Sequence, residues 1–476
     1  MIRQLVGHSA AYTFANLASR GTIFVWLLVL PRFMSSADYG ALGLIMTVVA
    51  IGAVGVPLEV SQGLARYYPT ALENERRGWS KSAWTFTLLA VGLTCVASLV
   101  FAPALSRLLL GDHYVSEFRF AAAYFALNTC FIFLQHQFRW AFRPRNYTLV
   151  TLTFAVASLL LSIGLAATLS NPLEGVLIGL LSGAAIGVAF AMISLRDVIG
   201  LGVDASKLSR MLRFSLPLMP AGIALLLSTY ASRFILKDLL TLADVGLFTW
   251  ASQLANIAPL LLLGVQAAVT PLVMKHHGDA ETPALLARSF EAVFAAILAT
   301  CLAIGLFAPE LIQLLGYSSY AKCAPLVLIL GPAYLLLQLY VFFPGFAVAE
   351  RTRFQLIVSV IAAIGAVAFN YLLIGMMGLT GAAFASLAAS ALFFGLWVAF
   401  SQPLYPVPAR WGKLALYCVL FAACAILGRN LAAGSWLAMC AKIGMLALLA
   451  GAALALGLIR AGQLGTIIRM GIPKPA

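Results

Sequence analysis

The chain has 476 residues, of which 62% are hydrophobic and only 10% are charged, and its mean hydropathy is +0.99. A soluble globular protein carries about 25% charged residues, so this composition excludes a soluble protein and predicts a multi-pass membrane protein. The net charge of +14 is spread over short connections between apolar segments. We therefore expect anionic membrane lipids, and no nucleic acid, as its partners.

Fourteen apolar segments of membrane-spanning length, about 20 residues each, follow one another along the chain. They cover residues 8–31, 40–63, 82–104, 118–139, 147–169, 173–195, 213–235, 244–273, 287–308, 321–348, 354–376, 379–400, 412–428 and 435–459. The first lacks a cleavage-site pattern, so we expect a retained helix. With both termini in the cytoplasm, 21 of the 30 Lys and Arg residues fall on the cytoplasmic face and seven on the other, as the positive-inside rule requires.

The first twelve segments form two halves whose landmarks recur about 206 residues apart. The recurring landmarks are residues 37–40 with 243–246, Ala102 and Pro103 with Ala308 and Pro309, Tyr114 with Tyr320, Arg143 and Arg145 with Arg351 and Arg353, and Gly175 with Gly381. The predicted fold is an all-α membrane protein with two pseudo-symmetric six-helix lobes, 1–205 and 206–405. A helix pair and a short tail, 406–476, complete it. Parallel repeats of this kind place a substrate path between the lobes.

The segment that opens the second half contains two prolines, Pro217 and Pro220. Each proline removes a backbone donor, so we expect a bent helix with a hinge at these residues. Farther along the same segment lie Tyr230 and Arg233. Arg233 is near the outer end of the helix, where either snorkelling to the membrane surface or facing a cavity would satisfy its charge.

Arg20 lies about twelve residues into the first segment, one turn after Asn16. A charge near the bilayer centre costs at least about 2.5 kcal/mol, so we expect Arg20 to face a hydrated cavity. Gln253 and Asn256 add a polar trace to the eighth segment, where hydrogen bonding between helices is the alternative role. We predict that Arg20, Arg233, Asn16, Tyr230, Gln253 and Asn256 line a cationic substrate-binding cavity.

Other ionisable groups suggest further roles. Glu59 and Arg66 lie toward the inner end of the second segment and are candidates for ion coupling, although an ion pair between them is the favoured alternative. Lys442 is expected to snorkel, and Glu291 and Glu350 are expected at the membrane interface.

The sequence contains no GxSxG elbow, no Gly-rich phosphate-binding turn after a strand and no carboxylate pair on a long loop. We therefore expect no catalytic residue and no enzyme. The seven cysteines lie mostly in apolar segments without metal-ligand spacing, so we expect no metal and no cofactor beyond a coupling ion. Because a guanidinium grips phosphate through paired hydrogen bonds, the residues indicate an exporter or flippase for an amphiphilic anion.

Several stretches resemble one family of transporters. They are LPRFMSSADYGALGL at 30–44, LARYYP at 64–69, FSLPLMPAGIA at 214–224, ADVGLFTWASQLA at 243–255, VTPLVMK at 269–275 and FNYLLIGMMGLTGAAFASLAAS at 369–390. The chain is similar to the Wzx-type polysaccharide flippases of the multidrug, oligosaccharidyl-lipid and polysaccharide (MOP) exporter superfamily. In this family an Asp often precedes the Arg of the seventh helix. Here Ser232 precedes Arg233, which argues against ion coupling by an Asp at that point.

The resemblance implies ion-coupled alternating access that moves undecaprenyl-diphosphate-linked oligosaccharide from the inner to the outer leaflet of a bacterial cytoplasmic membrane. It implies H⁺ or Na⁺ as the coupling ion, the lipid-linked oligosaccharide and polysaccharide polymerase or export proteins as partners, and a functional monomer. The alternatives are a multidrug/cation antiporter of the same superfamily and a membrane-embedded polysaccharide polymerase or ligase.

Overall fold

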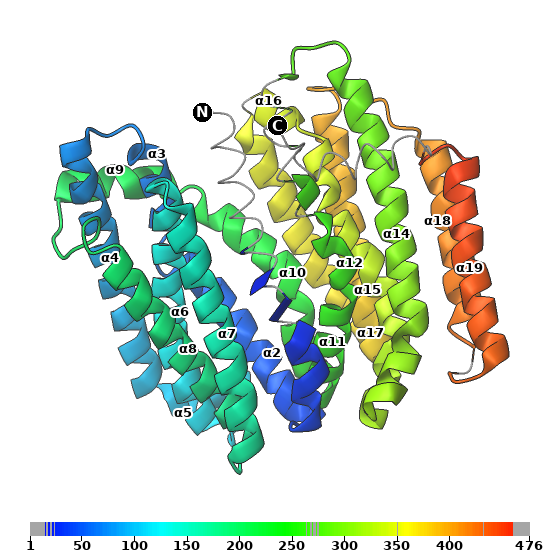
Figure 1. Ribbon diagram of the computed structural model, residues 1–476, viewed down its shortest axis with the longest axis horizontal. Helices are drawn as coiled ribbons and strands as arrows, with labels where there is room; N and C mark the ends of the chain where they lie inside the picture. The colour runs from blue at the N-terminus through cyan, green and yellow to red at the C-terminus, as the bar shows by residue number, and fades with distance from the viewer. Residues whose placement is uncertain are drawn as a thin grey trace. The chain divides into compact units, whose positions relative to one another are not determined.

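The computed structural model is built from helices, and no strand occurs in the part of the chain that it describes (Figure 1). The described residues are 24–262, 276–349, 351–431 and 433–459, together with Ala15, Ala18, Ser19, Gly21, Thr22, residues 264–266, Val269 and Val273. The predicted all-α membrane fold is confirmed. The chain packs into two compact units, Met1–Thr249 and Trp250–Ala476.

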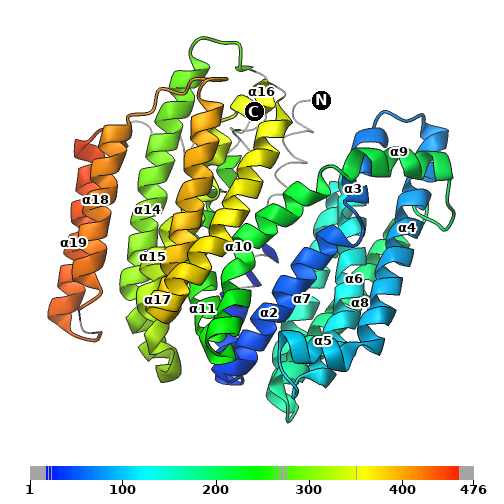
Figure 2. The same cartoon turned by 180° about the vertical axis from the view of Figure 1, so that it is seen from behind.

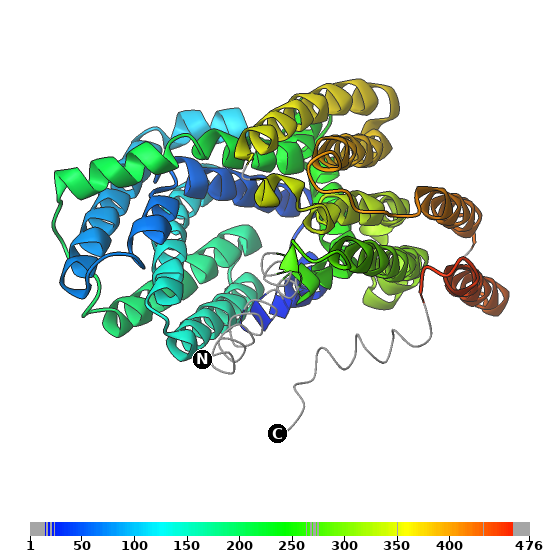
Figure 3. The same ribbon diagram turned by 90° about the horizontal axis from the view of Figure 1, so that it is seen from above.

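The first unit is a helical bundle with two short helices at one end. Its elements are η1 (Leu30–Arg32), α2 (Ser36–Gly55), α3 (Val60–Tyr67), α4 (Glu73–Val100), α5 (Ala102–Leu109), α6 (Val115–Trp140), α7 (Pro144–Thr168), α8 (Pro172–Ser194), α9 (Ala205–Ser215) and α10 (Met219–Leu239). Helix α8 packs on α6 and α7, and α10 packs on α2 (Figure 2). Helix α9 lies across the end of the bundle and contacts α3 and α4 (Figure 3).

The second unit begins within α11 (Leu242–Ala255). Its elements continue with α12 (Ile257–Leu260), α14 (Thr282–Leu315), η2 (Ser318–Cys323), α15 (Ala324–Leu336), η3 (Leu339–Phe342), α16 (Gly345–Val348), α17 (Thr352–Ser401), α18 (Trp411–Gly428) and α19 (Trp436–Ala455). Helix α14 is central, because it contacts α15, α18 and α19. The division into lobes at residue 205 stays a prediction.

Ten helical segments among the described residues are long and apolar enough to span a membrane, or up to eleven with the bent pair α11 and α12. Helix α17 accounts for two expected spans. Its 50 residues would reach about 75 Å if straight, against a hydrocarbon core of about 30 Å, and it folds back at Gly378 (φ 59°, ψ −135°). Eleven of the 24 residues of the first expected span lie outside the described residues, so the total of fourteen stays a prediction.

Several of the expected continuous spans are broken, among them those over 40–63 and 244–273. The span predicted over 40–63 ends as α2 at Gly55 and resumes as α3 at Val60, because Pro57 has no N–H and both Leu58 (φ 51°) and Glu59 (φ 52°) are left-handed. The span predicted over 244–273 bends by 42° after Ala255.

The landmarks that recur at 206 residues share their local structure. The Ser35 hydroxyl caps α2 and donates to Asp38 at 2.7 Å, while the Thr241 hydroxyl donates to Asp244 at 2.6 Å. In each case the backbone N–H of the Asp donates back to the hydroxyl oxygen. Helices α2 and α11 therefore begin with the same capping arrangement.

Equivalent residues of these two helices lie in contact. A Cβ added at Gly40 would lie 1.9 Å from the carbonyl oxygen of Leu242, and one added at Gly246 would lie 1.9 Å from that of Ser36. Such close approach of two backbones requires glycine at both positions. Helices α2 and α11, which begin the corresponding stretches of the repeat, therefore pack directly against each other at these glycines.

The recurrence extends beyond these helices. The N–H of Arg143 donates to the Phe138 carbonyl at 2.9 Å, and that of Arg351 donates to the Phe346 carbonyl at 3.0 Å. Glycine again allows tight antiparallel packing at the other recurring pair. A Cβ at Gly175 would lie 2.6 Å from backbone atoms of Leu165, and one at Gly381 would lie 1.9 Å from the Leu373 carbonyl oxygen.

Candidate functional site

Arg233 is held inside the first unit, where α2, α10 and α11 meet. Its side chain is only 9% exposed, and its guanidinium carbon lies 4.8 Å from the ring centroid of Tyr230, one turn earlier on α10. Its Nε donates to the Thr249 hydroxyl at 3.3 Å. The aromatic face offsets part of the cost of removing a guanidinium from water, and the hydroxyl fixes its orientation. Arg233 therefore does not snorkel to the surface.

Thr249 is the residue of this site that the sequence reasoning missed. It is 3% exposed, and a Cβ added at Gly43 of α2 would lie 2.5 Å from its hydroxyl oxygen. Gly43 and Thr249 are themselves 206 residues apart. The repeat offset relates Thr249 to Gly43, and the structure places the two residues in contact.

A second polar position lies where α2 breaks. The half-buried Glu59 extends toward α10, because a Cβ added at Gly222 would lie 3.4 Å from its Oε1. The break between α9 and α10, at residues 216–218, contains Pro217. Helix α2 packs on α10, and α3 packs on α9. The break between α2 and α3 therefore lies beside the break between α9 and α10.

The expected pairing of Glu59 with Arg66 is wrong. The exposed Arg66 guanidinium lies 4.7 Å from the ring centroid of Phe214 on α9, and no ion pair joins Glu59 to Arg66 in the described chain. The left-handed turn at Glu59 is the reason, because it directs the carboxylate toward α10 while Arg66 lies two turns along α3.

The two prolines occupy different positions from those expected. Pro217 lies in the turn between two separate helices, and Pro220 lies in the first turn of α10, so neither interrupts a continuous helix. Proline is well tolerated at a helix start, because the N–H it lacks would have no intrahelical partner there. The hinge role of these residues stays a prediction.

The other predicted residues are distributed as follows. Asn16 and Arg20 lie outside the described residues. Gln253 and Asn256 belong to the second unit. The Gln253 Oε1 is buried without a hydrogen-bond partner in the described structure, and Asn256 stands at the N-cap position of α12, at the bend, without a side-chain capping hydrogen bond. No cluster of three or more His, Cys, Asp or Glu able to hold a metal ion occurs in the described part of the chain.

The sequence matches a known protein family. The family model of polysaccharide biosynthesis proteins matches residues 5–277, which is more than half of the chain. The chain belongs to the polysaccharide biosynthesis protein family. No curated protein matches the sequence.

Solved structures share the fold of this polysaccharide biosynthesis protein. The lipid II flippase MurJ in an inward closed conformation is 14% identical, with a TM-score of 0.69 over 92% of this chain and 97% of that chain. An inward-facing multidrug resistance MATE family transporter of the MOP superfamily is 16% identical, with a TM-score of 0.61 over 84% and 96%. A MOP superfamily transporter from Pyrococcus furiosus is 14% identical, with a TM-score of 0.53 over 83% and 96%. The chain thus shares the fold of these MOP transporters, as expected, and the assignment to the Wzx-type subgroup stays a prediction.

Two further charged groups of the polysaccharide biosynthesis protein form ion pairs, and one of them, Lys442, differs from expectation. Lys442 of α19 is fully buried, pairs with Glu310 of α14 and lies 5.8 Å from the Phe307 ring centroid, so it does not snorkel. Glu291 is 1% exposed and accepts hydrogen bonds from the Arg410 backbone N–H at 2.8 Å and from its Nε at 3.0 Å. Both pairs tie the last two helices and their connection to α14. Glu350 lies outside the described residues.

Proposed function

We propose that this polysaccharide biosynthesis protein is a flippase that moves undecaprenyl-diphosphate-linked oligosaccharide from the cytoplasmic to the periplasmic leaflet of a bacterial inner membrane. Arg233 carries the proposal, because it is a buried guanidinium in a chain of this family and fold. Retaining a charge inside a membrane bundle is costly and marks substrate pathways. A diphosphate is the ligand that matches it best.

The surroundings of Arg233 suit this role. Thr249 takes the Nε–H and Tyr230 covers one face of the guanidinium. The two terminal nitrogens, with two N–H donors each, are therefore the groups that would meet the phosphate oxygens. A guanidinium that is already oriented loses less conformational entropy when it binds.

Glu59 is the proposed site for the coupling ion, H⁺ or Na⁺. Pro57 offers no N–H to the Ala53 carbonyl, and the Leu58 N–H donates to Gly55 and not to Val54. The end of α2 thus presents carbonyl oxygens whose usual helical donors are lost, beside a half-buried carboxylate. Unwound carbonyls and helix C-terminal ends coordinate ions in this way in secondary transporters.

Alternating access by rocking of the two repeats completes the proposal, with both termini in the cytoplasm, a polymerase or export protein as partner and a monomer as the working unit. A multidrug/cation antiporter is the second candidate, because the MATE family transporter shares the fold. A buried arginine favours an anionic substrate over a cationic drug.

Transport of a fluorescent lipid-linked oligosaccharide in proteoliposomes tests the proposal. We expect label to become accessible to an impermeant quencher on the opposite side, without any new glycosidic bond. Arg233→Ala should slow this by about tenfold or more, since a hydrogen bond to a charged group contributes about 1.5–3 kcal/mol. Arg119→Ala, at an exposed arginine of α6, is the matched control. Lengthening of the sugar, or transport of cationic drugs but not of the lipid, would refute the flippase.

A further inference from the structure

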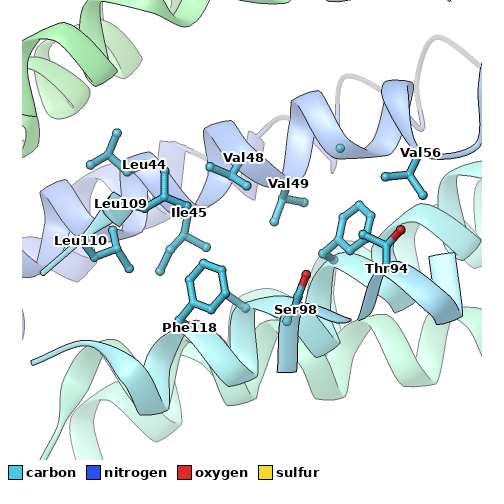
Figure 4. Close-up of a pocket in the computed structure, with 14 residues that line it drawn as sticks. Leu44, Ile45, Val48, Val49, Val56, Thr94, Ser98, Leu109, Leu110 and Phe118 are labelled. Atoms are coloured by element: carbon cyan, nitrogen blue, oxygen red, sulfur yellow. The ribbon is translucent and has the colours of Figure 1, made fainter. Parts of the chain in front are cut away.

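A narrow apolar slot lies within the first unit (Figure 4), and Arg233 is not among the residues that line it. Its empty volume is about 580 Å³, which includes the part open at its side. Fourteen residues of α2, α4, α5 and α6, together with the residues that follow α2 and α5, line it, and only Thr94 and Ser98 of α4 carry hydroxyl groups. The Thr94 hydroxyl donates to the Ala90 carbonyl of its own helix at 2.8 Å. The slot therefore offers an almost wholly hydrocarbon lining.

The slot exists because α2 and α4 both pack on α6, with small side chains on the α6 face between them. Ala121 and Ala122 of α6 line this face. At the deep end, the Phe125 ring packs directly against α2 at Gly52, because a Cβ added there would lie 2.8 Å from the ring. This contact closes the slot. At the other end Leu109 and Leu110, at the end of α5, form the rim.

The depth of the slot matches one leaflet of a bilayer. Along α6 its lining runs from Phe118 to Phe125, the latter ten residues after the first residue of the helix, Val115. At 1.5 Å per residue the slot reaches about 15 Å below the end of α6. Half of a hydrocarbon core of about 30 Å is the same distance. A chain that enters at the α5 end and lies in the slot would thus occupy a single leaflet.

The surroundings of the slot are those of a lipid site. Leu93, Val100 and Leu108, on α4 and α5, are 67–74% exposed and continue the apolar surface toward lipid. At the α5 end, the Lys237 ammonium donates to the Leu108 carbonyl at 3.0 Å, immediately before the lining residue Leu109. Arg119, exposed on α6, directly follows the lining residue Phe118. Cationic groups therefore lie at the level where a lipid phosphate would sit.

We infer that this slot binds one acyl chain of an anionic membrane glycerophospholipid, with the phosphate headgroup at Lys237. The length favours a chain that ends within one leaflet over a long polyisoprenoid tail. The Lys and Arg distribution predicts that this is the outer leaflet. The inference does not depend on the transported substrate, because it concerns a separate surface of the first unit.

Photocrosslinking in nanodiscs tests the inference. The probe is phosphatidylglycerol with a photoreactive group on its acyl chain, and crosslinked peptides are mapped by mass spectrometry. We expect crosslinks within 44–56 and 118–125. Val48→Trp, which fills the slot, should lower them at least about fivefold, and Ser98→Phe provides a second filling variant should the first not fold. Leu160→Trp, at an exposed position of α7 that does not line the slot, is the matched control and should leave them unchanged.

The headgroup is tested with Lys237→Gln, which should lower the preference for phosphatidylglycerol over phosphatidylethanolamine by about fivefold, as expected for one lysine near anionic lipid. Crosslinking that persists in both folded slot-filling variants would overturn the inference. Displacement of the probe by a polyisoprenyl diphosphate, but not by unlabelled phosphatidylglycerol, would also overturn it, because the slot would then hold a substrate tail. Oligosaccharide transport, measured separately in the same variants, reports on the flippase proposal alone.

Discussion

Gly40→Ala tests the close contact between α2 and α11. The added methyl group would lie 1.9 Å from the Leu242 carbonyl oxygen and 2.9 Å from the Gly246 nitrogen, whereas ordinary contact begins at 3.4 Å. Because both neighbours are main-chain atoms, no side chain can rotate away, and α2 and α11 must separate by about 1.5 Å. Overpacking costs about 1–3 kcal/mol, and we expect the upper end of that range here.

A loss of about 3 kcal/mol lowers the thermal midpoint of a unit of this size by about 6–12 °C. The measurement is thermal unfolding of purified protein, followed by tryptophan fluorescence. Gly92→Ala is the matched control, because Gly92 lies inside α4 with no atom within 4 Å of the added Cβ. Alanine is the better helix former there by about 1 kcal/mol. If the thermal midpoints of Gly40→Ala and Gly92→Ala differ by less than about 2 °C, the close contact at Gly40 is refuted.

Three further predictions follow from single contacts. Lys442→Met should lower the free energy of unfolding by about 3 kcal/mol, because it leaves the half-buried Glu310 without its partner, and adding Glu310→Met should restore most of the loss. Equal losses in the single and double variants would contradict this. Thr249→Val should slow transport about tenfold or more, because it removes the hydroxyl that accepts from Arg233 Nε. Thr249→Ser keeps the hydroxyl and should keep the transport rate. Similar transport rates in the two variants would exclude an orienting role for Thr249. The Arg143 guanidinium beside Asp197 holds the pKa of that carboxyl below its usual value, so the stability it contributes is complete above the ordinary Asp pKa and lost as pH falls through the lowered one. Asp197→Asn should remove this acid-side loss from the unfolding midpoint, and an unchanged pH profile would argue against the ion pair.

The membrane-embedded helical fold and the repeat were predictable from the sequence. Apolar segments of spanning length and a skewed Lys and Arg distribution are local properties that packing does not alter. The recurrence of residues 37–40 at 243–246 was also visible, and the structure gives both stretches the same cap. Pro57 was visible too, yet the break after Gly55 also depends on the left-handed Leu58 and Glu59, which the sequence did not indicate.

The buried partners were not predictable in the same way. Lys442 resembles a snorkelling lysine by its position in the helix, and its partner Glu310 lies 132 residues away on α14. Arg66 lies within two turns of Glu59, yet it stacks on Phe214 of a different helix. Likewise, the offset of 206 relates Gly43 to Thr249, but it does not state that they touch. Sequence spacing fixes which residues share one helix face and not which helix that face meets.

Each membrane helix satisfies its own backbone hydrogen bonds, so its existence follows from its own residues. The sequence accordingly specified the membrane-embedded helical fold and the family. Close packing between helices depends on which small or polar side chains are brought face to face. The tertiary structure alone therefore decided that Arg233 is held by Tyr230 and Thr249, and that Gly40 and Gly246 lie in contact.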